Sequence, residues 1–249
     1  MTLGLPLEDA LDVLASRRPL LLASDYDGVL ARLRDDPGAA VPEPFVADLL
    51  ARLASANGVT VALVSGRGVA DLQATSGLTG PYRWVGSHGA EFDGPLDAAL
   101  LAARDRLAGQ LRPLVDAVPG ALMEVKPASV AVHVRPVADR AAAARLLADV
   151  AAGPGAAGGL TAKPGKDVLE LAMTDADKGT AIVRLRGEVG ADGVLYLGDD
   201  VTDEDVFAVL GREDVTVKVG PGGTSAQHRV AGLDEVREVL ERLATALAV

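Results

Sequence analysis

The alternation of short apolar runs with amphipathic segments constrains the fold of this chain more than any other feature. The run Leu20–Ser24 is too short for a buried helix and predicts a buried central strand, and Val59–Val64 predicts a second one. Between them, Pro44–Ala56 carries apolar side chains at helical spacing and ends at Asn57-Gly58, a helix stop signal. Strand, helix and strand in this order predict a parallel sheet with helices on both faces.

The same alternation continues outside the middle of the chain. A helix over Leu7–Ala15 precedes the first strand, and a helix near Gly68–Ser76 leads to a strand over Tyr82–Val85 that ends at Gly86. Toward the C-terminus the patterns predict helix Lys178–Glu188, strand Gly193–Leu197, helix Thr202–Leu210, strand Val215–Val219 and helix Leu233–Ala248. In such a sheet, catalytic groups are expected just after the C-terminal ends of the strands.

The middle of the chain follows a different rhythm. Two Val-rich runs, Leu122–Lys126 and Ser129–Arg135, flank a Pro-Ala turn and predict a hairpin. Further elements are expected at Leu96–Val118, Ala138–Val150, Leu160–Lys163 and Val168–Ala172, with a Gly/Ala/Pro loop over 151–159. We therefore predict an α/β protein: a doubly wound parallel-sheet core, residues 1–96 and 176–249, with an inserted smaller α+β cap domain, residues 97–175.

Composition excludes several classes of function. The net charge of −11 and the lack of a Lys/Arg cluster disfavour nucleic acid and anionic membranes as partners, and aromatic residues at 3% leave few platforms for stacking bases. The lack of cysteine excludes disulfides and thiolate chemistry. Because Met1–Arg18 has no signal-peptide pattern and no 18-residue apolar run occurs, we expect a cytoplasmic protein. A small anionic molecule remains a possible substrate, since a bound cation and a few Lys/Arg can reverse the potential within one cleft. We expect a monomer.

Two acidic groups follow predicted strands. Asp25 and Asp27 stand at i and i+2, where extended side chains point the same way, so two carboxylates share one small space and call for a divalent cation or a shared proton. A second group, Gly198–Asp205, opens a helix after another strand. If the two strands are neighbours, both groups meet at one edge of the sheet, and carboxylate oxygens in that number favour Mg²⁺. The alternatives are turn or helix-cap roles, above all for Asp203 and Asp205.

Two further residues add to this edge. Ser65 follows the second strand, where its hydroxyl and nearby N–H groups can donate to a phosphoryl oxygen; the alternative is an N-cap. Lys178 begins the helix that re-enters the core, and its ammonium can neutralise phosphate, although most lysines lie on solvated surface.

These motifs, in this order, resemble the haloacid dehalogenase superfamily over the whole core. The chain more specifically resembles the trehalose-phosphatase family, nearly end to end, on five motifs: Asp25-Tyr26-Asp27-Gly28, Ser65-Gly66-Arg67, Gly86-Ser87-His88-Gly89-Ala90-Glu91, Lys178-Gly179-Thr180-Ala181, and Gly198-Asp199-Asp200-Val201-Thr202-Asp203-Glu204-Asp205. One position departs from the pattern, since Val29 stands where many members have Thr.

The resemblance implies Mg²⁺-dependent hydrolysis of trehalose 6-phosphate. Asp25 would attack phosphorus and form an aspartyl phosphate, while Asp27 protonates the departing sugar oxygen and later activates water. Asp25, Asp199 and the carbonyl of Asp27 would hold the ion with support from Asp203. The transferring phosphoryl group would be stabilised by the ion, Lys178, Ser65 and loop N–H groups such as that of Gly28. Val29 is expected to slow or alter the chemistry only slightly.

By similarity, the sugar would be selected at the core rim and by the cap. The candidates are Arg67, His88 and Glu91 in the core and Lys126, His133, Arg135, Lys166 and Glu170 in the cap. Strand alternation predicts that His133 and Arg135 share one face with Ala131; the alternative for both is solvation. His228 lies outside every motif and is expected at the surface.

Three other functions fit parts of the pattern. A phosphatase for sucrose phosphate, mannosylglycerate phosphate or a hexose phosphate would keep the chemistry and change the sugar. A catalytically silent phosphosugar-binding module is disfavoured because the acids and Lys178 are intact. A phosphomutase would use the same intermediate and return the phosphate to a sugar.

Overall fold

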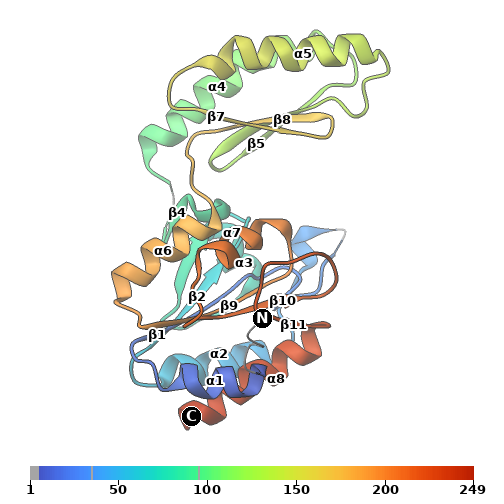
Figure 1. Cartoon of the computed structure of the whole chain (residues 1–249). Coiled ribbons are helices and arrows are strands. Elements are labelled where there is room, and N and C mark those ends of the chain that lie inside the picture. Colours follow the sequence, from blue (N-terminus) through green and yellow to red (C-terminus); the bar gives the residue numbers. More distant parts are fainter. Residues whose placement is uncertain (1–5, 35, 95) are drawn as a thin grey trace. The chain divides into compact units, whose positions relative to one another are not determined.

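The computed structural model describes residues 6–34, 36–94 and 96–249. The described chain divides into two compact units, one made of Met1–Pro95 with Ala176–Val249 and the other of Leu96–Asp175 (Figure 1). We call the first the core unit and the second the cap unit.

The described residues of the core unit form a seven-stranded sheet with the order β11-β10-β9-β1-β2-β3-β4. Its strands are β1 (Leu20–Ser24), β2 (Val59–Val64), β3 (Arg83–Gly86), β4 (Glu91–Phe92), β9 (Gly193–Gly198), β10 (Val215–Val219) and β11 (His228–Val230). All neighbours pair in parallel except β3 and β4. The central strand β1 is buried along its whole length, as its uninterrupted apolar sequence predicts.

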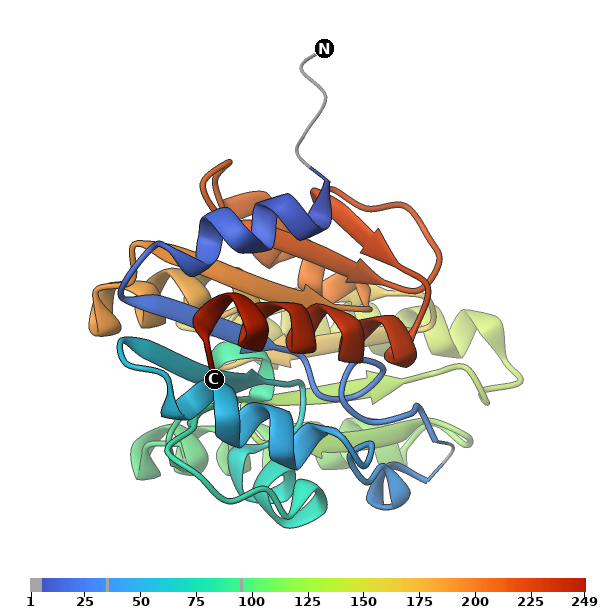
Figure 2. The same cartoon turned by 90° about the horizontal axis from the view of Figure 1, so that it is seen from below.

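Helices cover both faces of this sheet. They are α1 (Leu7–Ala15), α2 (Val46–Ser55), α3 (Val69–Ser76), α6 (Lys178–Val189), α7 (Glu204–Val209) and α8 (Leu233–Leu247). On one face α8 lies between α1 and α2 (Figure 2), and their apolar sides form the larger buried cluster with alternate strand residues. The remaining strand residues pack under α6 and α7. The predicted doubly wound α/β architecture is therefore confirmed.

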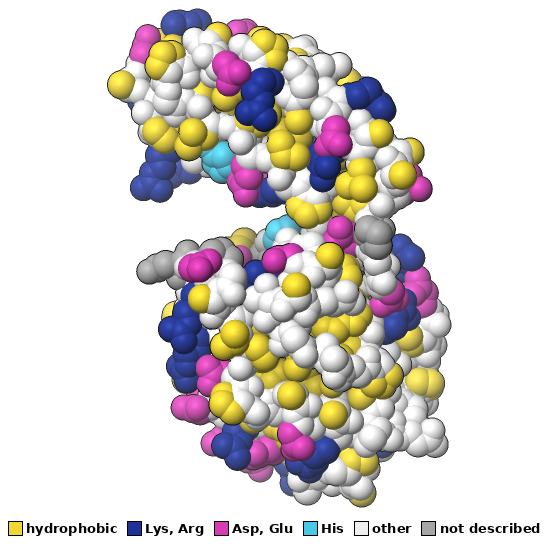
Figure 3. Space-filling view, turned by 180° about the vertical axis from the view of Figure 1, so that it is seen from behind, with side chains coloured by type: hydrophobic (Ala, Val, Ile, Leu, Met, Phe, Trp, Pro, Cys, Tyr) yellow, Lys and Arg dark blue, Asp and Glu magenta, His cyan; other side chains and the backbone are white. Residues whose placement is uncertain are grey.

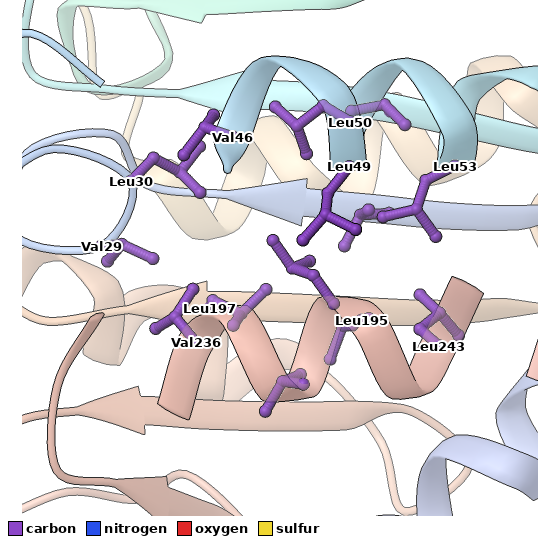
Figure 4. Close-up of a cluster of buried hydrophobic side chains, with 14 of the residues drawn as sticks. Val29, Leu30, Val46, Leu49, Leu50, Leu53, Leu195, Leu197, Val236 and Leu243 are labelled. Atoms are coloured by element: carbon purple, nitrogen blue, oxygen red, sulfur yellow. The ribbon is translucent and has the colours of Figure 1, made fainter. Parts of the chain in front are cut away.

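Val29 belongs to the larger buried cluster. Its side chain is completely buried, in the same group of apolar side chains as Leu197 and Val236 (Figure 4). We expect Val29→Thr to lower the free energy of unfolding by about 1 kcal/mol, because a hydroxyl would enter an apolar cluster, while phosphate release changes less than about tenfold. Urea unfolding and a phosphate assay on the same preparations test this, and a thousandfold gain in turnover would contradict it.

The cap unit, all of which lies within the described residues, is an antiparallel sheet with two helices. The strands β5 (Leu122–Lys126), β6 (Ser129–His133), β8 (Val168–Ala172) and β7 (Thr161–Gly165) lie in this order, with helices α4 (Ala98–Asp116) and α5 (Arg140–Ala152). One sheet face, which includes Val130, Val132 and Leu171, packs with apolar residues of both helices. The alternate residues form the other face, which carries polar side chains; we call it the polar cap face.

Besides shifts of one or two residues at other element ends and short 3-10 turns, the structure differs from the sequence predictions in the following elements. The predicted helix Thr202–Leu210 is a short 3-10 turn, Val201–Asp203, followed by α7, because Asp203 accepts from the N–H of Asp200 and tightens the first turn. The strands β4 and β11 were not predicted, since two or three residues carry too little periodicity. The strand predicted to reach Arg135 ends at His133.

Among the residues that the structure describes, no helix combines the length and apolarity needed to cross a membrane. On the face shown in Figure 3, Lys and Arg side chains are interspersed with Asp and Glu side chains.

Candidate active site

The predicted chemical groups follow three adjacent strands of the core sheet. Strand β1 pairs with β2 on one side and with β9 on the other, in parallel. Asp25 therefore follows the central strand, while Ser65 and Asp199 follow its two neighbours. Because parallel strands end at the same edge, these side chains meet at the carboxyl edge of the sheet.

Three carboxylates meet at this edge. Asp25, Asp199 and Asp203 each offer a carboxylate oxygen, and these oxygens lie within 4.8 Å of one another. Among the described residues, these three acids form a group that could hold a metal ion. Gly28 lies against them with φ +81°, and a Cβ on it would lie 2.0 Å from Oδ2 of Asp199. Glycine is thus required both for the left-handed backbone and for the close approach of Asp199. The backbone N–H of Gly28 donates to the carbonyl of Ala31.

Lys178 connects two of these acids. It begins α6, whose N-cap Asp177 forms a reciprocal capping box with Thr180. Its Nζ donates to Oδ2 of Asp25 at 2.7 Å and to Oδ1 of Asp203 at 2.8 Å. All three side chains are nearly inaccessible, with exposed fractions of 2% for Lys178, 7% for Asp25 and 0% for Asp203. The alternative that Lys178 lies on solvated surface is therefore wrong, since it forms buried ion pairs with Asp25 and Asp203.

Burial and mutual repulsion shift the pKa values of this group. Burial raises the pKa of Asp25 to about 8, assisted by the charges of Asp203 and Asp199 and opposed by Lys178. Burial and Asp203 likewise raise the pKa of Asp199 to about 6. Burial works against the charge of Lys178, but the carboxylates of Asp25 and Asp203 outweigh it and raise its pKa. The excess negative charge at this edge favours a cation.

These shifts predict a pH dependence of metal binding. Protons must leave Asp25 and Asp199 before both can ligate, and their raised pKa values place this loss between about pH 6 and pH 8. We expect the affinity for Mg²⁺ to rise at least about tenfold from pH 6 to pH 8, measured by titration calorimetry on metal-free protein.

The same shifts predict the stability of the metal-free protein. The folded state binds protons at Asp25 and Asp199 more tightly than the unfolded state, so its free energy of unfolding should fall as pH rises from about 4 to about 8. Saturating Mg²⁺ should remove this fall. A free energy of unfolding that increases with pH over this range in EDTA would contradict the raised pKa values of Asp25 and Asp199.

Asp27 lies at the same edge but pairs differently. Its two carboxylate oxygens accept from Nε and Nη2 of Arg67 at 2.7 and 2.9 Å, and Nη1 of Arg67 donates to Asp71 at 3.0 Å. Arg67 is 10% exposed, and its guanidinium lies 6.0 Å from the centre of the Tyr26 ring. The structure thus brings Asp27 to the site edge in a two-pronged ion pair, with its carboxylate outside the three-acid group.

The other core candidates line the neighbouring loops. Ser65 is buried, and its Oγ accepts from the N–H of Arg67 at 3.1 Å. His88 lies in a left-handed turn with its ring against Gly66, where an added Cβ would approach Cε1 to 2.6 Å. Glu91 is buried, and its Oε2 accepts from the N–H of Val69 at the start of α3. The Glu91 carboxylate therefore stabilises the start of α3.

Three of the cap candidates lie on the polar cap face. Lys126 donates to Glu170 at 3.0 Å, Ser129 donates to the other oxygen of Glu170 at 2.6 Å, and His133 contacts Glu124 at 3.0 Å. Burial acts to raise the pKa of Glu170, but the hydrogen bonds from Ser129 and Lys126 outweigh burial and lower this pKa.

The remaining two cap candidates lie outside the strands. Lys166 lies in the β7–β8 turn, and Arg135 lies beyond the end of β6. The prediction that Arg135 continues the strand with His133 was wrong, because the chain turns at Arg135-Pro136, and a proline cannot continue the ladder. Both side chains are exposed.

Sequence reasoning missed two buried residues of this site. The Tyr196 hydroxyl donates to Oδ1 of Asp203 at 2.7 Å, and burial followed by the charge of Asp203 raises the Tyr196 pKa well above its usual value. Nζ of Lys218, a buried residue of β10, donates to the carbonyl of Asp199. Each is a polar side chain in a largely apolar strand, a signal that could have found them.

The parallel sheet with β1 at its centre, the three acids and the buried lysine define a haloacid dehalogenase-like core. The crystal structure of Aspergillus fumigatus trehalose-6-phosphate phosphatase has the same fold, with a TM-score of 0.79 at 23% identity over 98% of this chain and 99% of that one. The trehalose-phosphatase family model matches residues 23–236. The chain belongs to the trehalose-phosphatase family.

Curated relatives agree with this membership. The Escherichia coli trehalose-6-phosphate phosphatase is 35% identical over 236 residues, which cover 90% of this chain and 86% of that protein. The bifunctional trehalose-6-phosphate synthase/phosphatase of Thermoproteus tenax is 37% identical over 239 residues, 92% of this chain. The chain spans 32% of the length of the Thermoproteus tenax protein.

Proposed function

We propose that this chain is a Mg²⁺-dependent phosphatase that hydrolyses trehalose 6-phosphate through an aspartyl-phosphate intermediate. The observation that carries the proposal is the buried contact between Asp25 and Lys178 inside a three-carboxylate group at the carboxyl edge of the sheet. Family membership over 23–236 and relatives named as trehalose-6-phosphate phosphatases support the choice of substrate.

The residues present fit Mg²⁺. Oxygen donors from Asp25, Asp199 and Asp203 are close enough to share one ion, and burial together with the neighbouring carboxylates raises the pKa values of the first two. Asp25 and Asp199 would hold the ion together with the carbonyl of Asp27. When bound, the ion supplies positive charge that offsets the repulsion between a carboxylate nucleophile and a phosphate dianion.

The side chains would carry out a two-step displacement. A carboxylate oxygen of Asp25 attacks phosphorus, the bond between phosphorus and the sugar oxygen breaks, and the Asp27 carboxyl gives its proton to that oxygen. Asp27 then takes a proton from water, which attacks the aspartyl phosphate, releases phosphate and restores Asp25. Both oxygens of Asp27 accept from Arg67 in the structure, so the acid step requires this pair to open. Lys178 and Ser65 would donate to the phosphoryl oxygens.

We assign sugar selection to polar groups outside this catalytic set. The polar cap face presents Lys126, His133 and Glu170 with fixed partners, and side chains held in this way discriminate hydroxyl groups better than mobile ones. Arg135 and Lys166, at the ends of the strands, and Arg67, His88 and Glu91, around the core site, complete the proposed set.

An assay of phosphate release tests the proposal. Trehalose 6-phosphate, sucrose phosphate, mannosylglycerate phosphate and glucose 6-phosphate are compared without a bisphosphorylated activator, each with Mg²⁺ and with EDTA. We expect kcat/KM for trehalose 6-phosphate to exceed the others at least about tenfold and EDTA to abolish release. Equal rates on the panel would reject the substrate, and release that persists in EDTA would reject the metal.

A further inference from the structure

The fully buried Tyr196 on β9 carries a hydroxyl that its packing does not require. Its ring lies in the apolar cluster under α6 and α7 and makes an edge contact with Phe207, with centroids 5.9 Å apart at 72°. Phenylalanine would fill the same space. A buried hydroxyl is costly unless it is hydrogen bonded, and here it donates to Oδ1 of Asp203 at 2.7 Å.

Asp203 is held by donors from three directions. Besides Tyr196, its Oδ1 accepts from Nζ of Lys178 at 2.8 Å, and its Oδ2 accepts from the N–H of Asp200 at 2.9 Å. Its side chain is completely buried. A carboxylate engaged in this way acts mainly on its protein neighbours, and the neighbour that faces the proposed nucleophile is Lys178.

Lys178 in turn divides its ammonium between two acids. The distances to Asp25 and Asp203, 2.7 and 2.8 Å, are nearly equal, so the lysine is held between them. Without the Tyr196 hydroxyl, Asp203 would satisfy Oδ1 with Lys178 alone and draw the ammonium away from Asp25.

We infer that Tyr196 is a positioning residue for the proposed phosphatase reaction: through Asp203 it holds Lys178 against Asp25. This inference rests on the proposed function, and it names a residue that none of the family motifs in the sequence contains. Tyr196 would contact neither substrate nor metal, and its effect would pass through two hydrogen bonds.

The test is Tyr196→Phe, which removes one oxygen atom and keeps the ring. Turnover of trehalose 6-phosphate is measured at saturating Mg²⁺, and the Kd for Mg²⁺ is measured separately by calorimetry. We expect kcat to fall about tenfold, with KM and the Kd for Mg²⁺ changed less than about threefold. The matched control is Tyr82→Phe. Tyr82 is buried, precedes β3 at the end of that strand away from the carboxyl edge of the sheet, and makes an edge contact with Trp84. The kcat of this variant should equal that of the wild type.

A second variant shows whether the effect passes through Asp203. In an Asp203→Asn background, Tyr196→Phe should cause no further loss of kcat. Unchanged kcat in folded Tyr196→Phe would overturn the inference, as would a Kd for Mg²⁺ that weakens in step with kcat, because Asp203 would then act on the metal. If Asp203→Asn does not fold, the kcat and Kd of the single variant decide.

The proposed function can fail separately from this inference. If the wild type releases no phosphate from trehalose 6-phosphate but hydrolyses p-nitrophenyl phosphate, the substrate is wrong, and the comparison of Tyr196→Phe with Tyr82→Phe is made on p-nitrophenyl phosphate. If the wild type hydrolyses neither ester, both proposals fail.

Discussion

Asp25→Asn should lower the rate of phosphate release by about a thousandfold or more. An amide cannot form the acyl phosphate, and the neighbouring acids cannot replace it: Asp203 is tied to Lys178, Tyr196 and the backbone. Because Asn is almost the same size as Asp and removes a charge that is costly to bury, the folded protein should be at least as stable as the wild type in EDTA.

Two measurements make this test specific. Trapping of labelled phosphate on the protein during turnover should succeed with the wild type and fail with Asp25→Asn. Asp9→Asn, at an exposed position of α1, is the matched control and should keep full activity. Residual turnover of Asp25→Asn within tenfold of the wild type would show that Asp25 is not the nucleophile.

Lys178→Met should damage both stability and catalysis. Removing the cation leaves Asp25 and Asp203 buried without their shared partner, which costs about 3–5 kcal/mol in such pairs. It also removes a donor to the phosphoryl group, worth about a hundredfold or more in kcat. Urea unfolding in EDTA and kcat at saturating Mg²⁺ measure the two effects.

A surface ion pair provides the contrast. Arg237 and Glu241 on α8 lie 2.7 Å apart, as close as Lys178 and Asp25, but both side chains are exposed. Arg237→Met should leave stability and turnover unchanged, because water screens the pair. An equal loss of stability in the two variants would mean that burial does not determine the strength of the Lys178 pair. A stable, fully active Lys178→Met would remove Lys178 from the mechanism.

Much of the fold could be predicted from local sequence patterns. The strands over Leu20–Ser24 and Val59–Val64 were predicted with their observed bounds because apolar runs of that length have few alternatives. Elements with weak periodicity were missed: β11 is only His228–Val230, and His228 is half-buried rather than at the surface. The end of β6 was misplaced by two residues because the prediction did not take account of Pro136, which ends the ladder at the turn.

Local sequence patterns predict the order of strands and helices and the positions of the acids after strands, since periodicity and turn chemistry are local properties. The pairing of the charges, in contrast, depends on the tertiary structure. Lys178 lies 25 residues from Asp203 and 153 from Asp25, and it becomes their common partner only because α6 starts beside the end of β1. Tyr196 and Lys218 likewise contact the site only because of tertiary packing. Burial converts ordinary carboxylates and a lysine into a coupled group, and burial is a property of the assembled fold.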